Sequence, residues 1–317
     1  MSMNDVTIVA PVYLGKPHRL EYFQTYINYC LSQRDFDKMN FVFLVEPDVM
    51  DFDLLTKLRL YPNIRIMVNP YKESGWLPEW SSPGHRDCMI GSNSASIIAE
   101  AYLKGITNFD IETAYQGIIN SSKNEGPVSS VGRKGAKEYN SLGFIPYDTS
   151  INESVARTLE YAYNDYCIWK LAEKLGKPSD EIELFKKRSL NYKNVFDPST
   201  NFMRGKSSSG DFEDPFRADK WGGVFTEGSA WHYTWSVLHD PQGLINLMGG
   251  KDNYIKKMDE IFTSKPSSDY SYYGFKIHEI LEMELLNMGQ YAHGNQTIQH
   301  AIYFYNYAQE VENSRKN

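Results

Sequence analysis

The sequence predicts a mainly α-helical protein preceded by a short βαβαβ segment. Residues 5–70 alternate β-branched apolar runs with helical stripes, whereas residues 75–308 consist almost entirely of helical stripes. Gly and Pro punctuate the connections between these stripes. We therefore expect a boundary after residue 72, with the βαβαβ segment in 1–72 and a helical domain in 73–317.

Short apolar runs predict three strands in the N-terminal segment, at residues 6–14, 41–47 and 64–70. Helical spacing of the apolar residues predicts a helix over 19–33 and a second over 51–61. Strands that alternate with helices in this order are typical of a parallel sheet.

Helical periodicity dominates the rest of the chain, and the predicted helices cover residues 90–104, 111–121, 134–142, 153–175 and 180–196, with further helical segments up to residue 308. The clearest of them lies in NESVARTLEYAYNDYCIWKLAEKLG. Asn152 is its expected N-cap, and Gly176 is its expected end. Successive helices of this kind predict a chain of helical hairpins.

The charge balance argues against two classes of partner. A net charge of -7 provides no basic surface for nucleic acid or for an anionic membrane. No apolar run approaches the roughly 18 residues of a membrane-spanning helix. The first residues lack a basic stretch before their apolar segment, so we expect a cytoplasmic location for the chain as written. The aromatic share of 14% fits either stacking on sugar rings or a bulky core.

One carboxylate, Glu227, lies within the aromatic stretch GGVFTEGSAWHYTW, near Trp231 and Tyr233. A carboxyl group that apolar walls shield from water has a raised pKa, which a general acid needs at neutral pH. Alternatively, Thr226 caps a helix that begins at Glu227. The residues alone leave both interpretations open.

A pair of acidic residues also occurs in HEILE, residues 278–282, where Glu279 and Glu282 are spaced to share one helix face. An ordinary solvated helix face gives the same pattern. The stretch lacks the second histidine of the zinc-peptidase motif HExxH, so we do not predict a peptidase.

Most of residues 75–308 resembles glycoside hydrolase family 92, the calcium-dependent exo-α-mannosidases. The likeness is carried, in family order, by GWLPEWSSPGHRDCMIG, LEYAYNDYCIWKLAEKLGK, NYKNVFDPSTNFM, FTEGSAWHYTW, HDPQGLINLMGG and the segment 274–308. The resemblance implies an incomplete (α/α)6 toroid of helical hairpins. It also implies an inverting hydrolase that removes terminal α-1,2-linked mannose from α-mannoside glycans of the N-glycan or mannan type. Family members are usually periplasmic or secreted.

The resemblance assigns roles to particular residues. Glu227 matches the general acid, and Ca²⁺ is the implied cofactor, with metal ligands expected among Glu279, Glu282, Asn295 and Gln296. The expected substrate-binding residues are Trp76, Trp80, His85, Arg86, Trp231, His278, Glu279 and His293. The first four of these alternatively anchor the first helix. Ser229 and His232 replace the Asn and Gln that are more usual in the family.

The chain departs from the family pattern after residue 308. The family's general base comes from an acidic, glycine-flanked loop, and AQEVENSRKN offers only Glu310 and Glu312 outside that motif. We therefore expect the general base to be absent and the chain to be inactive or weakly active, since acid–base catalysis contributes about 10²–10⁴-fold. The incomplete ring also predicts an exposed apolar edge and self-association through it.

The N-terminal segment departs from the family as well, because a β-sandwich is usual there. Residues 5–70 more weakly resemble the start of a nucleotide-sugar glycosyltransferase. Asp51 and Asp53 have the spacing of that family's metal-binding pair, but we interpret them as a helix cap. Two alternatives to a hydrolase therefore stay open: a mannose-binding remnant without catalysis, and a glycosyltransferase fragment fused to a helical scaffold.

Overall fold

The structure of the protein, a computed structural model, describes residues 7–12, 25, 28, 29, 32, 40–45, 64–68, 74–77, 79, 87, 88, 90–107 and 109–308. The chain divides into two compact units, Met1–Arg86 and Asp87–Asn317. The sequence places this boundary earlier, after residue 72. Each unit is described by itself.

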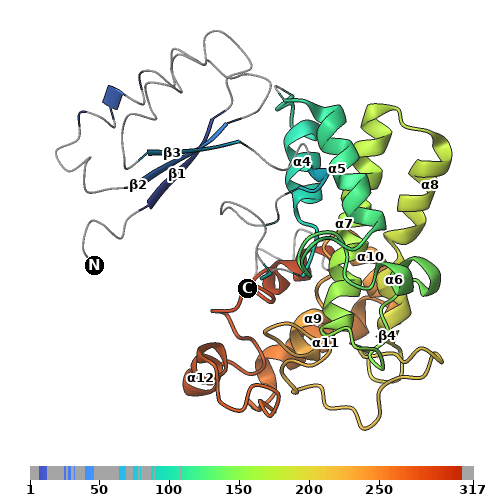
Figure 1. Cartoon of the computed structure of the whole chain (residues 1–317). Helices are drawn as coiled ribbons and strands as arrows, with labels where there is room; N and C mark the ends of the chain where they lie inside the picture. The colour runs from blue at the N-terminus through green and yellow to red at the C-terminus, as the bar shows by residue number, and fades with distance from the viewer. Residues whose placement is uncertain are drawn as a thin grey trace. The chain divides into compact units, whose positions relative to one another are not determined.

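The first unit contains three parallel strands in the order β1-β2-β3 (Figure 1). They are β1 (Thr7–Val12), β2 (Asn40–Val45) and β3 (Ile64–Val68). Each strand falls within one of the three predicted runs or begins one residue before it. The two helices predicted between them lie largely outside the described residues, as do Asp51 and Asp53.

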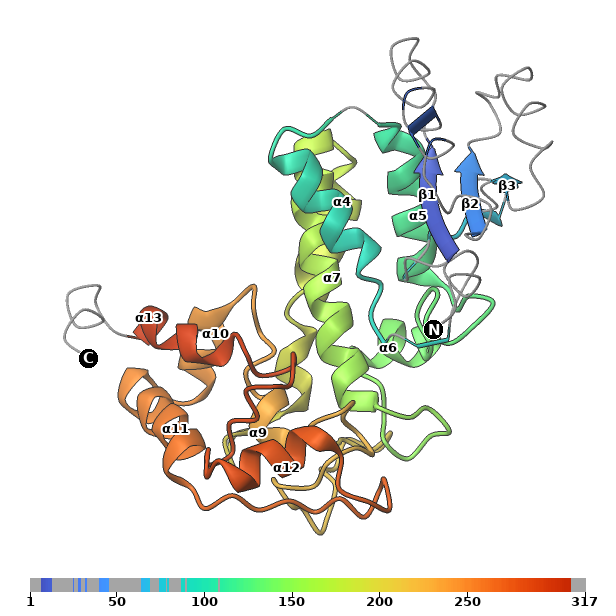
Figure 2. The ribbon, with the colours of Figure 1, turned by 90° about the vertical axis from the view of Figure 1, so that its left-hand side faces the viewer.

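The second unit is mainly helical, as predicted. Its first helices are α4 (Ser94–Leu103), α5 (Ile111–Lys123), α6 (Ala136–Leu142), α7 (Ser154–Leu175), α8 (Ser179–Arg188) and the 3₁₀ helix η4 (Asn191–Val195). After the short antiparallel pair β4 (Phe196–Asp197) and β5 (Phe202–Met203) come α9 (Ala230–Tyr233), α10 (Pro241–Leu247), α11 (Lys251–Thr263), α12 (His278–Leu285), η5 (Ala301–Phe304) and α13 (Tyr305–Ala308). Helices α4, α5 and α7 lie side by side, and α10, α11 and α13 contact one another in a separate group (Figure 2).

Helix α7 is the centre of this unit, with 14 of its 22 residues buried. It ends at Gly176, whose φ of 64° is the left-handed conformation expected at a helix end. The predicted cap at Asn152 is wrong. Glu153 occupies the N-cap position without a side-chain cap bond, and the Asn152 side chain accepts a hydrogen bond from Lys134 Nζ at 3.1 Å instead.

The helix predicted over 180–196 is too long, because α8 ends at Arg188. The chain continues through η4 into β4, where Asp197 begins a turn. Its carboxylate accepts a hydrogen bond from the Ser199 N–H at 2.9 Å, and Pro198 has no N–H to continue a helix. Local side-chain bonding therefore stabilises a turn at Asp197, nine residues beyond the end of α8.

A buried ionic cluster joins α6, α7 and α8. Asp165 of α7 forms ion pairs with Arg133 at 2.8 Å and with Arg188 of α8 at 3.0 Å, and it accepts a hydrogen bond from Tyr139 Oη of α6 at 3.0 Å. The side chains of Arg133 and Asp165 are both fully buried. Because neither charge reaches water, each depends on the other for its stabilisation.

Aromatic side chains fill the main core. Trp221, Trp235, Tyr192 and Tyr254 are buried with at most 1% of their surface exposed. Much of the high aromatic content is therefore structural.

In contrast, large apolar side chains on and near α12 stay exposed, among them Phe275, Leu281, Leu285 and Leu286. Self-association through such a surface stays a prediction. Within the described part of the chain, every helix is too short or too polar to cross a membrane.

Gly289 is a position where only glycine fits. Its φ is 65°, and a Cβ there would lie 2.2 Å from the Ile261 carbonyl oxygen. We expect Gly289→Ala to lower the free energy of unfolding by at least about 2 kcal/mol, because backbone atoms must move. Gly105→Ala is the matched control, since φ is 88° there and nothing lies within 4 Å of the new Cβ. Urea unfolding measures both, and equal losses would contradict the steric argument.

Candidate functional site

Glu227 is held in a strained backbone conformation at the surface. Its φ is 45°, a value that side-chain-bearing residues rarely adopt. Its N–H donates a hydrogen bond to Tyr273 Oη at 3.0 Å, and its carbonyl oxygen accepts one from Asn295 Nδ2. Two side chains from later in the chain therefore fix the backbone on both sides of this residue.

The aromatic residues lie beneath this loop rather than around the carboxylate. Phe225 stacks on Tyr233 with ring centroids 5.4 Å apart, and Tyr233 Oη donates a hydrogen bond to the Thr226 carbonyl at 2.7 Å. Both rings are buried, but Glu227 is exposed. The predicted shielding of the Glu227 carboxyl is therefore wrong, because the residue is exposed.

Helix α9 begins at Ala230, so the alternative in which Thr226 caps a helix at Glu227 is also wrong. Ser229 is the N-cap, and its N–H donates to His232 Nδ1 at 3.0 Å. The proton of the neutral ring therefore sits on Nε2, which donates to the Gln290 carbonyl at 3.1 Å. Burial lowers the pKa of His232 to about 4. A neutral imidazole thus ties the Glu227 loop to the segment that precedes Asn295.

We expect His232→Gln to make the protein less sensitive to acid. An unperturbed histidine has a pKa of 6.5, so the unfolded chain binds more protons than the folded one between pH 6.5 and about 4. Stability therefore falls as the pH is lowered through this window, by up to about 3 kcal/mol from this residue. Glutamine still offers an acceptor and a donor. Urea unfolding at pH 7 and pH 4.5 measures the difference, and an equal acid-induced loss in both proteins would contradict the assignment.

Trp231, an expected substrate-binding residue, already contacts the protein on its ring. Phe202 packs edge to face against it with centroids 4.7 Å apart, and Lys257 Nζ lies 4.7 Å from its centroid. Burial lowers the pKa of Lys257, whose ammonium also lies 3.4 Å from the Phe202 centroid. The substrate-binding role of Trp231 stays a prediction.

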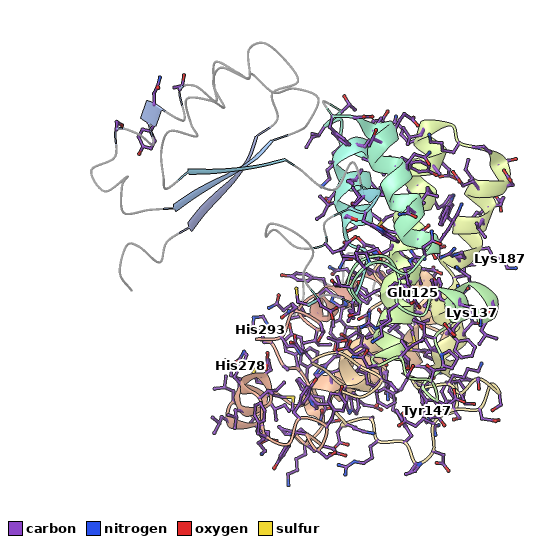
Figure 3. All side chains as sticks on the ribbon, viewed as in Figure 1. Glu125, Lys137, Tyr147, Lys187, His278 and His293 are labelled. Carbon is purple, nitrogen blue, oxygen red and sulfur yellow. The ribbon has the colours of Figure 1, made fainter. Side chains whose placement is uncertain are left out.

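Helix α12 places one acidic residue, Glu282, against the turn that contains His293. A Cβ on Gly294 would lie 2.3 Å from Glu282 Oε2, so this carboxylate packs directly against the turn. Glu279 is buried, with Oε1 3.2 Å from Nε2 of the exposed His278. His278 and His293 both lie on the edge of the unit that carries α12 (Figure 3).

Two buried oxygen atoms at this site have no hydrogen-bond partner among the described residues. They are Oε2 of Glu279 and Oδ1 of Asn295. The amide nitrogen of Asn295 donates a hydrogen bond to the Glu227 carbonyl oxygen. Gln296 is exposed, and Trp76 is half-buried in the first unit. The expected residues Trp80, His85 and Arg86, together with Glu310 and Glu312, lie outside the described residues. The structure thus joins Glu227 to the 293–296 turn and, through Glu282, to α12.

A cavity that the sequence did not predict lies behind the Glu227 loop. It has a volume of about 220 Å³ and is lined by Asn93, Leu159, Glu160, Tyr163, Tyr233, Ser236, Leu238, Gln296, Thr297 and His300. Glu160 was missed because it sits within the apolar stretch of α7. The signal that points to it is an acid directly between Leu159 and Tyr161, both of which are buried.

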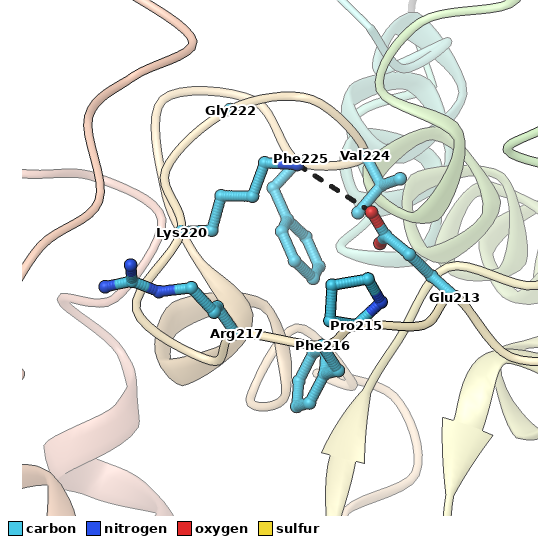
Figure 4. Close-up of a pocket in the computed structure, with 8 residues that line it drawn as sticks. All are labelled: Glu213, Pro215, Phe216, Arg217, Lys220, Gly222, Val224 and Phe225. Carbon is cyan, nitrogen blue, oxygen red and sulfur yellow. Dashed lines mark ion pairs between the residues drawn. The ribbon is translucent and has the colours of Figure 1, made fainter.

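A smaller hollow lies on the N-terminal side of the same loop (Figure 4). Its volume is about 20 Å³, which suits a water molecule rather than a sugar ring. Lys220 faces Glu213 across it at 3.7 Å, and Arg217 is paired with Asp219 at 3.0 Å. Its charged groups are therefore already compensated.

The family model for the glycosyl hydrolase family 92 catalytic domain matches residues 52–317. The chain belongs to glycosyl hydrolase family 92. This match begins within the N-terminal segment and covers the Glu227 loop, α12 and the 293–296 turn. The residues joined at the candidate site therefore all fall inside the family 92 domain.

Two solved family 92 structures from Bacteroides thetaiotaomicron are similar to this chain. An inverting mannosidase is 50% identical with a TM-score of 0.65, over 75% of this chain and 32% of its own. An α-mannosidase in complex with mannoimidazole is 37% identical with a TM-score of 0.63, over 74% of this chain and 30% of its own.

A curated relative, from Arthroderma benhamiae, is described as an uncharacterized secreted glycosidase. It is 33% identical over 231 aligned residues, which cover 62% of this chain and 30% of the relative. This family 92 chain therefore spans about a third of the length of the relatives it matches. Its cytoplasmic location stays a prediction.

Proposed function

We propose that this chain carries the general acid, Glu227, of a family 92 α-mannosidase. The observation that supports this most is the φ of 45° at Glu227. Such a conformation costs about 1–3 kcal/mol, and residues that adopt it cluster at functional sites. The described residues provide no ion pair or hydrogen bond to its carboxylate, so no such contact of the side chain offsets the backbone strain.

The proposed reaction is hydrolysis of a terminal α-1,2-linked mannoside in an N-glycan or mannan, with inversion at the anomeric carbon. Glu227 would protonate the departing glycosidic oxygen. The carboxylate that activates water on the opposite face of the ring in inverting enzymes is assigned to no residue of this chain, in line with the general base that we expect to be absent. In inverting enzymes the two carboxyl groups are about 6.5–9.5 Å apart. The names of the solved relatives, one an inverting mannosidase and one bound to mannoimidazole, support this choice. We further propose that the helical unit is part of an (α/α)6 toroid.

We propose Ca²⁺ as the cofactor, held by Glu279 and Asn295. Oxygen atoms from carboxylates and amides are the ligands that this ion prefers, and these two residues each bury one without a partner. Leaving a buried acceptor unsatisfied costs about 1–3 kcal/mol, which a bound cation would relieve. The described residues contain no group of three His, Cys, Asp or Glu side chains suited to a metal, so water and sugar hydroxyls would complete the coordination. When bound, the ion would supply positive charge that positions those hydroxyls.

Calcium binding predicts a change in stability that does not depend on activity. A ligand that binds only the folded protein stabilises it by about 2.7 kcal/mol at 100 times its Kd. We expect Ca²⁺ to raise the Tm of the chelator-treated protein, and Glu279→Gln to remove most of this rise. Glu183→Gln on the exposed face of α8 is the control. A full Ca²⁺ response in Glu279→Gln would contradict this ligand.

Hydrolysis of an aryl α-mannoside tests the function itself. Proton NMR of the first-formed sugar identifies the anomer, and the β-anomer is the product of inversion. Mannoside binding without turnover would instead support the non-catalytic alternative. Release of the α-anomer first would exclude the inverting mechanism.

A further inference from the structure

The cavity behind the Glu227 loop is much larger than the small voids that imperfect packing leaves. About 10–15 Å³ holds one water molecule, whereas this cavity has about 220 Å³. Gln296 and Leu238 are exposed among its lining residues, so it opens to solvent on their side. The cavity adjoins the candidate site, because Tyr233 both lines it and holds the Thr226 carbonyl.

Glu160 is the chemically unusual group in this cavity. Burial raises its pKa to about 7, although a hydrogen bond from the Asn93 side chain partly offsets the shift. Asn93 is held in place by Asn164 Nδ2, which donates to Asn93 Oδ1 at 3.1 Å. None of the described lining residues is Lys or Arg. At neutral pH the carboxyl group is therefore available both as a hydrogen-bond donor and as an acceptor.

The other lining residues combine hydroxyl and amide groups with apolar faces. Thr297 Oγ1 is buried without a hydrogen-bond partner among the described residues. Ser236 and Gln296 add further polar side chains, while Tyr163 and Leu159 supply flat or apolar surface. A few oriented polar groups within a largely apolar wall are typical of small-molecule sites.

This composition favours a neutral ligand with several hydroxyl groups. An anion would meet the Glu160 carboxyl without any Lys or Arg to compensate for it. The lining residues include a single carboxylate, and no group of three metal-binding side chains occurs among the described residues. The cavity therefore does not suit a metal ion. A sugar ring presents hydroxyls at its edge and C–H groups on its faces, which match both kinds of lining.

We propose that this cavity binds one neutral sugar ring of the glycan, and that Glu160 and Thr297 form the hydrogen bonds that orient it. The choice of mannose as that sugar rests on the proposed function. The cavity differs from the proposed catalytic and calcium sites, because none of Glu227, Glu279 and Asn295 lines it.

The test measures binding of methyl α-mannoside by saturation-transfer NMR in a background that carries Glu227→Gln and Glu279→Gln. Turnover is blocked there and the proposed calcium site is disrupted, so the binding that remains reports on this cavity. Adding Glu160→Ala should weaken binding at least about tenfold, because a hydrogen-bonding carboxyl is lost. Adding Glu160→Gln should change it by less than about threefold, since an amide also donates and accepts. Glu183→Ala, at an exposed position of α8, is the matched control.

Thr297→Val keeps the shape of the side chain and should also weaken binding, so it carries the test if Glu160→Ala does not fold. Equal affinity in Glu160→Ala and Glu160→Gln, or no binding in the parent, would overturn the proposal. The two proposals fail separately. If Glu160→Ala does not affect hydrolysis, the mannosidase function is supported and the sugar-binding cavity is contradicted. If binding depends on Glu160 but no hydrolysis occurs, the cavity is supported and the mannosidase function is contradicted.

Discussion

Glu227→Gln is expected to lower kcat for a natural α-mannoside by about 10²–10⁴-fold. The amide cannot transfer a proton to the departing oxygen. Because the side chain is exposed and unpaired among the described residues, the free energy of unfolding should change by less than about 0.5 kcal/mol. Steady-state kinetics and urea unfolding on the same samples measure both quantities.

Leaving-group chemistry identifies the role of this carboxylate. An activated aryl mannoside with an acidic phenol departs without much protonation, so Glu227→Gln should lose less activity on it than on a disaccharide. Equal losses on both substrates would instead indicate a role in activating water. Full activity on both would exclude Glu227 as the acid.

Glu227→Gly separates the chemical role from the structural one. Glycine adopts a φ of 45° without steric cost, whereas other residues lose about 1–2 kcal/mol there. We expect this variant to be inactive and yet at least as stable as the parent, since the gain offsets the extra flexibility of glycine in the unfolded chain. A large loss of stability would show that the glutamate side chain supports the fold.

Asp165→Asn is expected to have the largest effect on stability. It leaves Arg133, which is fully buried, without its negative partner, and it weakens the contacts of Arg188 and Tyr139. Removing one member of a buried ion pair costs about 3–5 kcal/mol, a large share of the total stability of a domain. The variant should therefore unfold at much lower urea concentrations or fail to accumulate in folded form.

Glu183→Gln provides the comparison, because it also removes one charge of an ion pair, here within α8, the helix that carries Arg188. Glu183 lies 3.2 Å from Lys186, but its side chain is 67% exposed and its partner's is 48% exposed. Such pairs contribute less than about 1 kcal/mol. Similar urea midpoints for the two variants would contradict the importance that we assign to the buried cluster.

The sequence was most informative where periodicity decides the structure. Helices α5, α6 and α7 begin and end within a few residues of the predicted bounds, and Gly176 ends α7 as expected. The prediction failed where one local contact decides the backbone. The predicted helix over 180–196 ends early, at Arg188, and Asn152 bonds to Lys134 rather than to the start of α7.

The sequence indicated which residues to consider for the candidate site but not how they are arranged, and their roles stay predictions. Motif resemblance placed Glu227 and Asn295 in one site, and the structure joins them through a hydrogen bond. The residue pattern indicated neither the exposure of Glu227 nor its positive φ. Glu160 was missed because its environment comes from Asn93 and Thr297, which are distant from it in sequence.

The left-handed backbone at position 227 has a consequence for how this chain evolves. A lineage that no longer needed the carboxylate would gain stability by exchanging it for glycine, so selection for stability should remove the residue. A library screened only for heat resistance should accordingly enrich glycine at this position, while one screened for sugar release should retain the acid.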